Sequence, residues 1–131
     1  MPMPPLQRIL LVDDEADIRQ IARLALEALG GFEIRECASG LAAPQAIRDF
    51  KPQLILMDVM MPGQDGLQTL KAMRAAPDLP QVPVVFMTAK VQPQEVRSFR
   101  TLGALDVIAK PFDPMTLAQT VRRIWDAQAP G

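Results

Sequence analysis

The stretch from Leu54 to Pro62, with the sequence LILMDVMMP, constrains the fold of this chain more than any other. Four large apolar residues end abruptly at an aspartate, Asp58, and a Met-Pro pair follows shortly after. An apolar run of this length, closed by turn residues, predicts a strand buried on both faces of a parallel sheet. Ligands of open α/β sheets bind beyond the carboxyl ends of such strands, so Asp58 is a candidate functional residue. The alternative is an ordinary strand-end aspartate that caps the next turn.

The length and composition predict one globular domain. The chain has 131 residues, 49% of them hydrophobic, and none of its apolar runs approaches the ~20 residues of a membrane span. We expect a domain over residues 6–127, with a disordered tail at 1–5 and a second tail at 128–131. The amino terminus lacks the basic and apolar segments of a secretory signal. We therefore expect a cytoplasmic location and no membrane partner.

Residue counts and the net charge exclude several kinds of site. One cysteine, Cys37, cannot form an internal disulfide, and a chain without histidine offers neither a zinc site nor a histidine-based catalytic triad. Any metal must therefore be bound by oxygen. The formal net charge of -1 provides no basic field, and lysine and arginine are scattered along the chain. Direct binding of nucleic acid is not expected.

Strand-like and helix-like segments alternate along the chain. Each connection is long enough for a right-handed crossover, so five strands and five helices predict an α/β fold, a doubly wound parallel sheet with helices on both faces. The strands are expected at residues 8–12, 32–37, 54–58, 82–87 and 105–109.

Apolar spacing and cap residues locate the helices. Ser39 is the expected N-cap of the second helix, in which Pro44 predicts a late start or a kink. Asp113 and Pro114 are expected to begin the last helix, with the proline at its first position. Spacings of three and four predict the buried face of the first helix, which comprises Ile18, Ile21, Ala22, Ala25 and Leu29.

Polar side chains follow four of the predicted strands, at the edge where their carboxyl ends meet. Asp13 and Asp14 end the first strand, Asp58 the third, Thr88 the fourth and Lys110 the fifth. Carboxylates ~4 Å apart repel by ~4 kcal/mol at an effective dielectric of ~20, so three together need a cation. Hard oxygen ligands favour Mg²⁺. Taken singly, each residue type also suits an ordinary structural position, namely a helix cap for the acidic pair, a strand for Thr88 and a solvated strand end for Lys110.

These motifs, in this order, resemble the receiver domain of two-component response regulators. The resemblance rests on the acidic pair, the central aspartate followed by Met-Pro and Gly66, the Thr-Ala pair at Thr88 and the Lys-Pro pair at Lys110. It covers about residues 6–127 and implies a flavodoxin-like fold with strands in the order 2-1-3-4-5. It also implies a stand-alone signalling domain, which is not an enzyme beyond catalysing its own phosphorylation and dephosphorylation.

The resemblance implies how the phosphoryl group would be held. Asp58 would be the phosphoacceptor, whose carboxylate attacks phosphorus and forms a mixed anhydride. Lys110 would pair with this carboxylate and then with a phosphoryl oxygen. Thr88 would offer its hydroxyl group to another phosphoryl oxygen.

The resemblance also implies a set of ligands for Mg²⁺. Asp14, Asp58 and the backbone carbonyl of Met60 would bind the ion directly, whereas Asp13 would act mainly through a metal-bound water. So few protein ligands suit Mg²⁺, which keeps several waters. We expect the side chains of the methionines in this region to pack rather than to bind a metal, and these are Met57, Met60 and Met61.

Two residues depart from the family's usual pattern. Val107 stands three residues before Lys110, where family members carry tyrosine or phenylalanine. Pro44 is unusual within the second helix. Both positions concern the signalling surface or its supports rather than the phosphoryl site.

Three hypotheses for the function come from different classes. The first is a phosphorylation-activated switch that receives its phosphoryl group from a histidine kinase or a phosphotransfer protein. It would signal to a separate target protein, as a monomer or a weak phosphorylation-dependent dimer, unless the chain is a fragment of a longer one. The second is a receiver-like interaction module that works without phosphorylation. The third, a phosphohydrolase with an aspartyl nucleophile, fails because dehalogenase-type phosphatases need a second aspartate where this chain has Met60.

Overall fold

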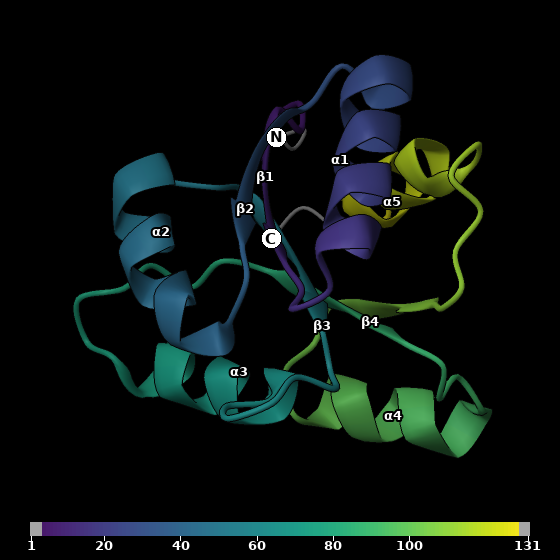
Figure 1. The fold of residues 1–131 in the computed structure, drawn as a ribbon. Helices are drawn as coiled ribbons and strands as arrows, with labels where there is room; N and C mark the ends of the chain where they lie inside the picture. Colours follow the sequence, from purple (N-terminus) through teal and green to yellow (C-terminus); the bar gives the residue numbers. More distant parts are fainter. Residues whose placement is uncertain (1–3, 129–131) are drawn as a thin grey trace.

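The computed structural model describes residues 4–128, which form one parallel sheet with helices on both faces (Figure 1). The strands are β1 (Arg8–Val12), β2 (Glu33–Cys37), β3 (Leu54–Asp58), β4 (Val84–Thr88) and β5 (Asp106–Ala109). The helices are α1 (Ala16–Gly30), α2 (Ala43–Phe50), α3 (Gly66–Ala75), α4 (Pro93–Thr101) and α5 (Leu117–Asp126), and a 3-10 turn, η1 (Gly40–Ala42), precedes α2. The strand order β2-β1-β3-β4-β5 confirms the predicted fold.

The central strand β3 explains why its sequence is apolar without interruption. Leu54 and Leu56 pack in the core beneath α1 and α5, whereas Ile55 and Met57 pack beneath α2, α3 and α4. Figure 1 shows these two helical layers on opposite sides of the sheet. Burying a side chain of this size contributes roughly 1.5–3 kcal/mol, so both faces of β3 stabilise the fold. The strand therefore holds its last residue, Asp58, in a fixed place.

The strand boundaries differ slightly from the predicted ones. The fourth strand was expected at residues 82–87, and it spans Val84–Thr88. Pro83 has no amide hydrogen to donate to a neighbouring strand, although its carbonyl oxygen accepts a hydrogen bond from the Ile55 amide. The ladder therefore begins one residue after the proline, and the strand reaches Thr88.

The buried face of α1 differs from the prediction. Ala22, Ala25 and Leu26 are buried, whereas Ile21 and Leu29 are exposed. The prediction was wrong for those two because the helix contacts the sheet along a stripe narrower than its full set of apolar residues. Leu29, near the end of α1, lies beside α5 at the surface rather than over the sheet.

The starts of α2 and α5 illustrate two uses of capping residues. The Ser39 hydroxyl accepts a hydrogen bond from the Ala42 amide and caps η1, so the prediction that it caps the second helix was wrong, and the N-cap of α2 is Ala42. The helix begins late, with Pro44 in its first turn, as predicted. The prediction for α5 was wrong, because the helix begins at Leu117. Asp113 caps the turn that directly precedes the helix instead, where its carboxylate accepts a hydrogen bond from the Met115 amide.

The expected tails lie at the edge of the described part of the chain. Residues 1–3 and 129–131, which belong to the tails expected at 1–5 and 128–131, lie outside it. The carbonyl oxygen of Pro4 accepts a hydrogen bond from the Trp125 indole, and that of Pro5 accepts one from the side-chain Nε2 of Gln53. These two residues are thus attached to the domain. Among residues 4–128, no helix has the length and apolar character needed to cross a bilayer.

Candidate functional site

The parallel sheet brings the predicted site residues to one edge. Asp58 and Thr88 are the last residues of β3 and β4, and Asp13 and Lys110 directly follow β1 and β5. Asp13 is 0% exposed, Asp58 3% and Thr88 2%, so three polar side chains are buried at this edge. Buried polar groups need partners. The contacts of these three side chains therefore show how the site is built.

The segment after β3 folds back over the acceptor strand. The Gly66 amide donates a hydrogen bond to the carbonyl oxygen of Val59, and a Cβ atom at Gly66 would lie only 2.6 Å from the carbonyl oxygen of Asp58. A side chain at this position would collide with backbone, so only glycine permits this approach. Within the turn, the Met60 amide donates to Oδ1 of Asp58 over 3.2 Å and orients the carboxylate.

Lys110 joins two of the buried carboxylates. Its Nζ donates a hydrogen bond to Oδ2 of Asp13 over 3.0 Å and lies 3.4 Å from Oδ2 of Asp58. Burial on its own would lower the pKa of Lys110. The hydrogen bond to Asp13 and the charges of both carboxylates outweigh burial, so the pKa lies above its usual value of 10.5. The lysine is therefore fully charged at neutral pH.

The surroundings of Asp58 destabilise its ionised form relative to its protonated form. Burial raises the pKa of this carboxyl, and the negative charge of Asp13 raises it further. The charge of Lys110 and the hydrogen bond from the Met60 amide act in the opposite direction but do not cancel these effects. A positive group placed beside Asp58 would relieve this destabilisation.

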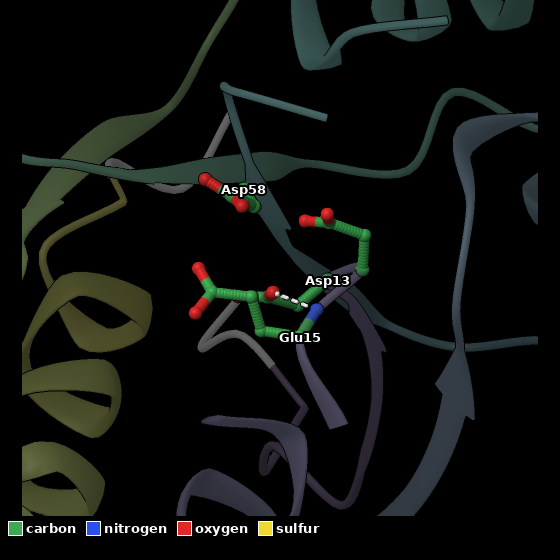
Figure 2. A group of neighbouring side chains, drawn as sticks. Asp13, Glu15 and Asp58 are labelled. Carbon is green, nitrogen blue, oxygen red and sulfur yellow. Dashed lines mark hydrogen bonds between the residues drawn. The ribbon is translucent and has the colours of Figure 1, made fainter. Parts of the chain in front are cut away.

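Four carboxylates gather at this point. Asp13, Asp14, Glu15 and Asp58 each offer an oxygen, and these oxygens lie within 4.8 Å of one another. Figure 2 shows the side chains of Asp13, Glu15 and Asp58 converging, with a dashed line for the hydrogen bond of 2.9 Å from the Glu15 amide to Oδ1 of Asp13. Oδ1 of Asp14 is buried and has no hydrogen-bond partner among residues 4–128. An unpartnered carboxylate oxygen within such a group is what a hard cation requires, so the donor set fits Mg²⁺.

Thr88 lies on the wall of a surface cavity of about 340 Å³ that also reaches Asp58 and Lys110. Its hydroxyl oxygen accepts a hydrogen bond from the Lys90 amide over 3.1 Å. The side chains of Ile18 and Met60 line the same cavity. The predicted residues therefore lie together, as expected, with carboxylates, an ammonium and a hydroxyl group around one cavity.

Sequence reasoning missed or misplaced three residues that lie at this site. Glu15 received no role, although it directly follows the acidic pair. Ile18 was assigned to the core, yet its side chain lines the cavity. The Met60 side chain was expected to pack, and instead the residue is 68% exposed, whereas Met57 and Met61 are buried. Only the fold of the turn after β3 decides which methionine faces outward.

A comparison with protein families decides the identity of this arrangement. A family model described as the response regulator receiver domain matches residues 9–122, which include every predicted site residue. The chain belongs to this family. It is therefore a receiver domain, the signalling switch of two-component systems.

Curated relatives match this chain over part of their own length. The DNA-binding response regulator MtrA of Mycobacterium tuberculosis is 37% identical over 116 residues, which cover 88% of this chain and 49% of the relative. The phosphate regulon transcriptional regulatory protein PhoB of Pseudomonas aeruginosa is 35% identical over 123 residues, covering 94% and 53%. The regulatory protein AtoC of Escherichia coli is 36% identical over 127 residues, covering 97% and 27%. The receiver domain thus spans about half or less of these relatives.

Solved structures match the receiver domain over nearly their whole length. The chemotaxis protein CheY4 of Vibrio cholerae superposes with a TM-score of 0.80 at 29% identity, covering 91% of this chain and 98% of that one. A putative response regulator from Chloroflexus aurantiacus has a TM-score of 0.78 at 33% identity, covering 92% and 98%. Both fold and sequence therefore place this chain among receiver domains.

Proposed function

We propose that this receiver domain is switched by a phosphoryl group that Asp58 accepts in the presence of Mg²⁺. One observation carries the proposal. Asp58 is buried at the end of the central strand, 3.4 Å from the ammonium of Lys110 and within 4.8 Å of three further carboxylates. A buried aspartate beside both a lysine and other carboxylates destabilises the folded protein. Such an arrangement is typical of a site that binds a charged group, such as a cation or a phosphoryl group.

The proposed transfer is a substitution at phosphorus. An oxygen of the Asp58 carboxylate forms a bond to the phosphorus atom while the bond between phosphorus and the donor breaks, and the donor leaves with that electron pair. The product is an acyl phosphate, a mixed anhydride of the aspartyl carboxyl and phosphoric acid. Stabilisation of the phosphoryl oxygens by positive and hydrogen-bonding groups supplies most of the catalysis in such transfers.

Lys110 and Thr88 are placed to contact those oxygens. Lys110 lies between Asp13 and Asp58, so a small movement of its ammonium would carry it to a phosphoryl oxygen. The Thr88 hydroxyl group faces the same cavity and can donate its hydrogen, because the contact with the Lys90 amide uses its oxygen only as an acceptor. The two residues would bind different oxygens of the group.

Mg²⁺ would be held by Asp14, Asp58 and the backbone carbonyl of Met60, with Asp13 acting through a water. When bound, the ion would neutralise charge on the phosphoryl oxygens and on the carboxylates. The buried Oδ1 of Asp14, which has no hydrogen-bond partner within residues 4–128, supports this assignment. Asp14→Asn should therefore weaken Mg²⁺ binding in the unphosphorylated protein.

The proposed partners follow from the chemistry of a transferable phosphoryl group. A histidine kinase or a phosphotransfer protein would donate it, and a separate protein would respond to the phosphorylated domain. Because such kinases draw on ATP, we place the exchange in the cytoplasm. MtrA is named as DNA-binding and PhoB as a transcriptional regulator, and this chain corresponds to about half of each. We propose that the present chain itself does not bind nucleic acid, and that it is a monomer or a weak phosphorylation-dependent dimer.

Incubation with acetyl phosphate and Mg²⁺, followed by intact-mass analysis, tests the proposal. The parent should gain one phosphoryl group, and Asp58→Asn should gain none. Asp17→Asn serves as a matched control, since this exposed aspartate lies near the acidic pair but outside the site, and it should be labelled like the parent. A labelled Asp58→Asn variant would show that the acceptor is misassigned. An unlabelled parent would favour the interaction module that works without phosphorylation.

A further inference from the structure

Arg19, near the start of α1, holds the turn that carries the acidic residues without joining the acidic group. Its Nη1 donates a hydrogen bond to the backbone carbonyl oxygen of Asp13 over 2.7 Å. Its Nε donates to Oε1 of Glu36 over 3.2 Å, and the side chain is only 18% exposed. Glu36 lies on β2, in register with Leu11 of β1. Arg19 thus links the acidic turn to a neighbouring strand.

Arg23, one helical turn later, shares the same acidic partner. Its Nη1 donates to Oε2 of Glu36 over 2.8 Å, and its Nε donates to Glu27 over 3.2 Å. The two arginines therefore carry the same charge and use the two oxygens of one carboxylate. Within the described residues, only Arg19 also bonds the carbonyl oxygen of Asp13.

The carbonyl group that Arg19 holds belongs to the peptide that joins Asp13 to Asp14. The other groups of Asp13 are fixed, since its amide donates to the carbonyl oxygen of Cys37 and its carboxylate accepts from Glu15 and Lys110. Asp14 differs, because its buried Oδ1 has no hydrogen-bond partner among residues 4–128. The direction of the Asp14 side chain is therefore set by its backbone, and Arg19 fixes that backbone on one side.

We propose that Arg19, held in place by Glu36, is a positioning residue that fixes the peptide between Asp13 and Asp14 for cation binding. The inference rests on the proposed function in one respect, namely that Asp14 binds the cation. A ligand that is already oriented loses less conformational freedom when it binds, and residues that orient metal ligands contribute to metal affinity in this way.

Electrostatics alone predicts that replacing Arg19 tightens cation binding, whereas the positioning role predicts that it weakens binding. Arg19 is positive, so replacing it with a neutral side chain removes repulsion toward a cation at the acidic group and should tighten binding. Positioning predicts weaker binding, because the peptide is no longer held. Arg23 carries the same charge and loses the same partner on substitution. Arg23→Gln is therefore a matched control for charge and for the ion pair with Glu36.

Calorimetric titration of Mg²⁺ into the unphosphorylated protein tests the inference. Arg19→Gln should weaken Mg²⁺ binding about tenfold, the lower end of the usual effect of residues that orient metal ligands. Arg23→Gln should leave the affinity unchanged or raise it. In labelling with acetyl phosphate, Arg19→Gln should need about tenfold more Mg²⁺ for half-maximal rate and should approach the parental rate at saturation. A purely structural role would not shift the Mg²⁺ dependence.

Parental or tighter Mg²⁺ binding by Arg19→Gln would overturn the inference, and so would equal weakening by Arg23→Gln. If Arg19→Gln does not fold, Arg19→Lys takes its place. This variant keeps the charge, but a single ammonium cannot reproduce the planar fork that reaches both Asp13 and Glu36, so its binding should also weaken. A parent that neither binds Mg²⁺ nor is labelled on Asp58 would overturn the proposed function together with this inference. If the parent binds Mg²⁺ and is labelled but Arg19→Gln binds as well as the parent, only this inference fails.

Discussion

Lys110 lies closer to Asp13 than to Asp58, with its Nζ 3.0 Å from Oδ2 of the first and 3.4 Å from Oδ2 of the second. The resemblance to receiver domains implies the pairing with Asp58, and the structure adds the shorter bond to Asp13. One ammonium thus offsets two buried carboxylates. Because the pKa of Lys110 is raised, this stabilisation is complete below pH 10.5 and is lost as the pH rises through the raised value.

Lys110→Met should destabilise the protein when divalent cations are absent. The substitution leaves Asp13 and Asp58 buried without a positive partner. We expect the free energy of unfolding at pH 7 to fall by about 2 kcal/mol, less than the roughly 3–5 kcal/mol of a fully buried pair, because the lysine is partly solvated. Mg²⁺ should recover more stability in the variant than in the parent, since the ion replaces the lost charge. Urea unfolding with and without Mg²⁺ measures both effects.

The exposed Lys90 provides the control for this experiment. Lys90→Met removes a lysine two residues after Thr88 and should change stability by less than about 0.5 kcal/mol, as surface substitutions usually do. Equal effects of the two substitutions, or a loss in Lys110→Met that Mg²⁺ does not relieve, would show that the ammonium does not offset the buried carboxylates.

Asp58→Asn should stabilise the unphosphorylated protein at neutral pH. Burial and the charge of Asp13 raise the pKa of Asp58 above its ordinary 3.8, so the folded state binds this proton more tightly than the unfolded state does. Folding stability is therefore lost as the pH rises from below 3.8 through the raised value. The amide avoids that loss and can still accept from the Met60 amide. We expect a gain on the order of 1 kcal/mol at pH 7.

The pH dependence separates this electrostatic effect from a change in packing. The difference in the free energy of unfolding between Asp58→Asn and the parent should shrink as the pH falls toward 3.8, and it should also shrink when Mg²⁺ is added to the parent. A variant that is less stable than the parent at pH 7 would contradict the inference that the ionised Asp58 carboxylate destabilises the folded protein.

The fold and the site edge could be predicted because both depend on local patterns. The apolar run before Asp58 specifies a strand buried on both faces, and parallel strands place Asp13, Thr88 and Lys110 at the same edge. These features need no knowledge of loop conformation. They follow from the period of the sequence and from chain direction, whereas the strand order is implied by the resemblance to receiver domains.

The features that were missed depend on how loops and helix ends pack. Nothing in the sequence distinguishes the exposed Met60 from the buried Met61, because the turn after β3 decides their directions. The contact of Arg19 with Glu36 requires α1 to lie against β2, and that relation arises only in the folded protein. Asp113 resembles a helix cap by sequence, and in the structure it caps the turn that directly precedes α5.

Met60→Asn should shorten the lifetime of the phosphorylated protein. The Met60 side chain lines the cavity above Asp58, and it is an apolar group that cannot orient a water for attack on phosphorus. An asparagine can hold such a water by hydrogen bonds, so we expect self-hydrolysis to accelerate roughly tenfold, a small part of what full positioning can contribute. Loss of the phosphoryl group over time, followed by intact mass, measures this rate.

Leu41→Asn is a matched control for that change. Leu41 is also an exposed apolar residue, but it lies on η1 rather than at the cavity. Its substitution should leave the rate of phosphoryl loss unchanged. A parent that loses its phosphoryl group as fast as Met60→Asn, or faster, would rule out a shielding role for the methionine.

Phosphorylation should rearrange mainly the segment from Ala89 to Gln94. The resemblance implies an aromatic side chain on the fifth strand that rotates on activation, but this chain has Val107, whose β-branched side chain is stiff about χ1. The Thr88 hydroxyl accepts a hydrogen bond from the Lys90 amide, so its movement toward a phosphoryl oxygen would break a contact within the loop. The change must arise from such differential contacts, because a ligand shifts an equilibrium only by its preference for one state.

Amide hydrogen exchange before and after labelling with acetyl phosphate measures this response. We expect the largest changes in protection at residues 89–94 and at the start of α4, with smaller changes along β5. Asp58→Asn treated in the same way controls for direct effects of the reagent, and its exchange should not change. Changes centred on residues 105–109, with 89–94 unaltered, would mean that the signal leaves the site through β5, where Val107 would then have to move by a shift of the strand itself rather than by rotation of its side chain.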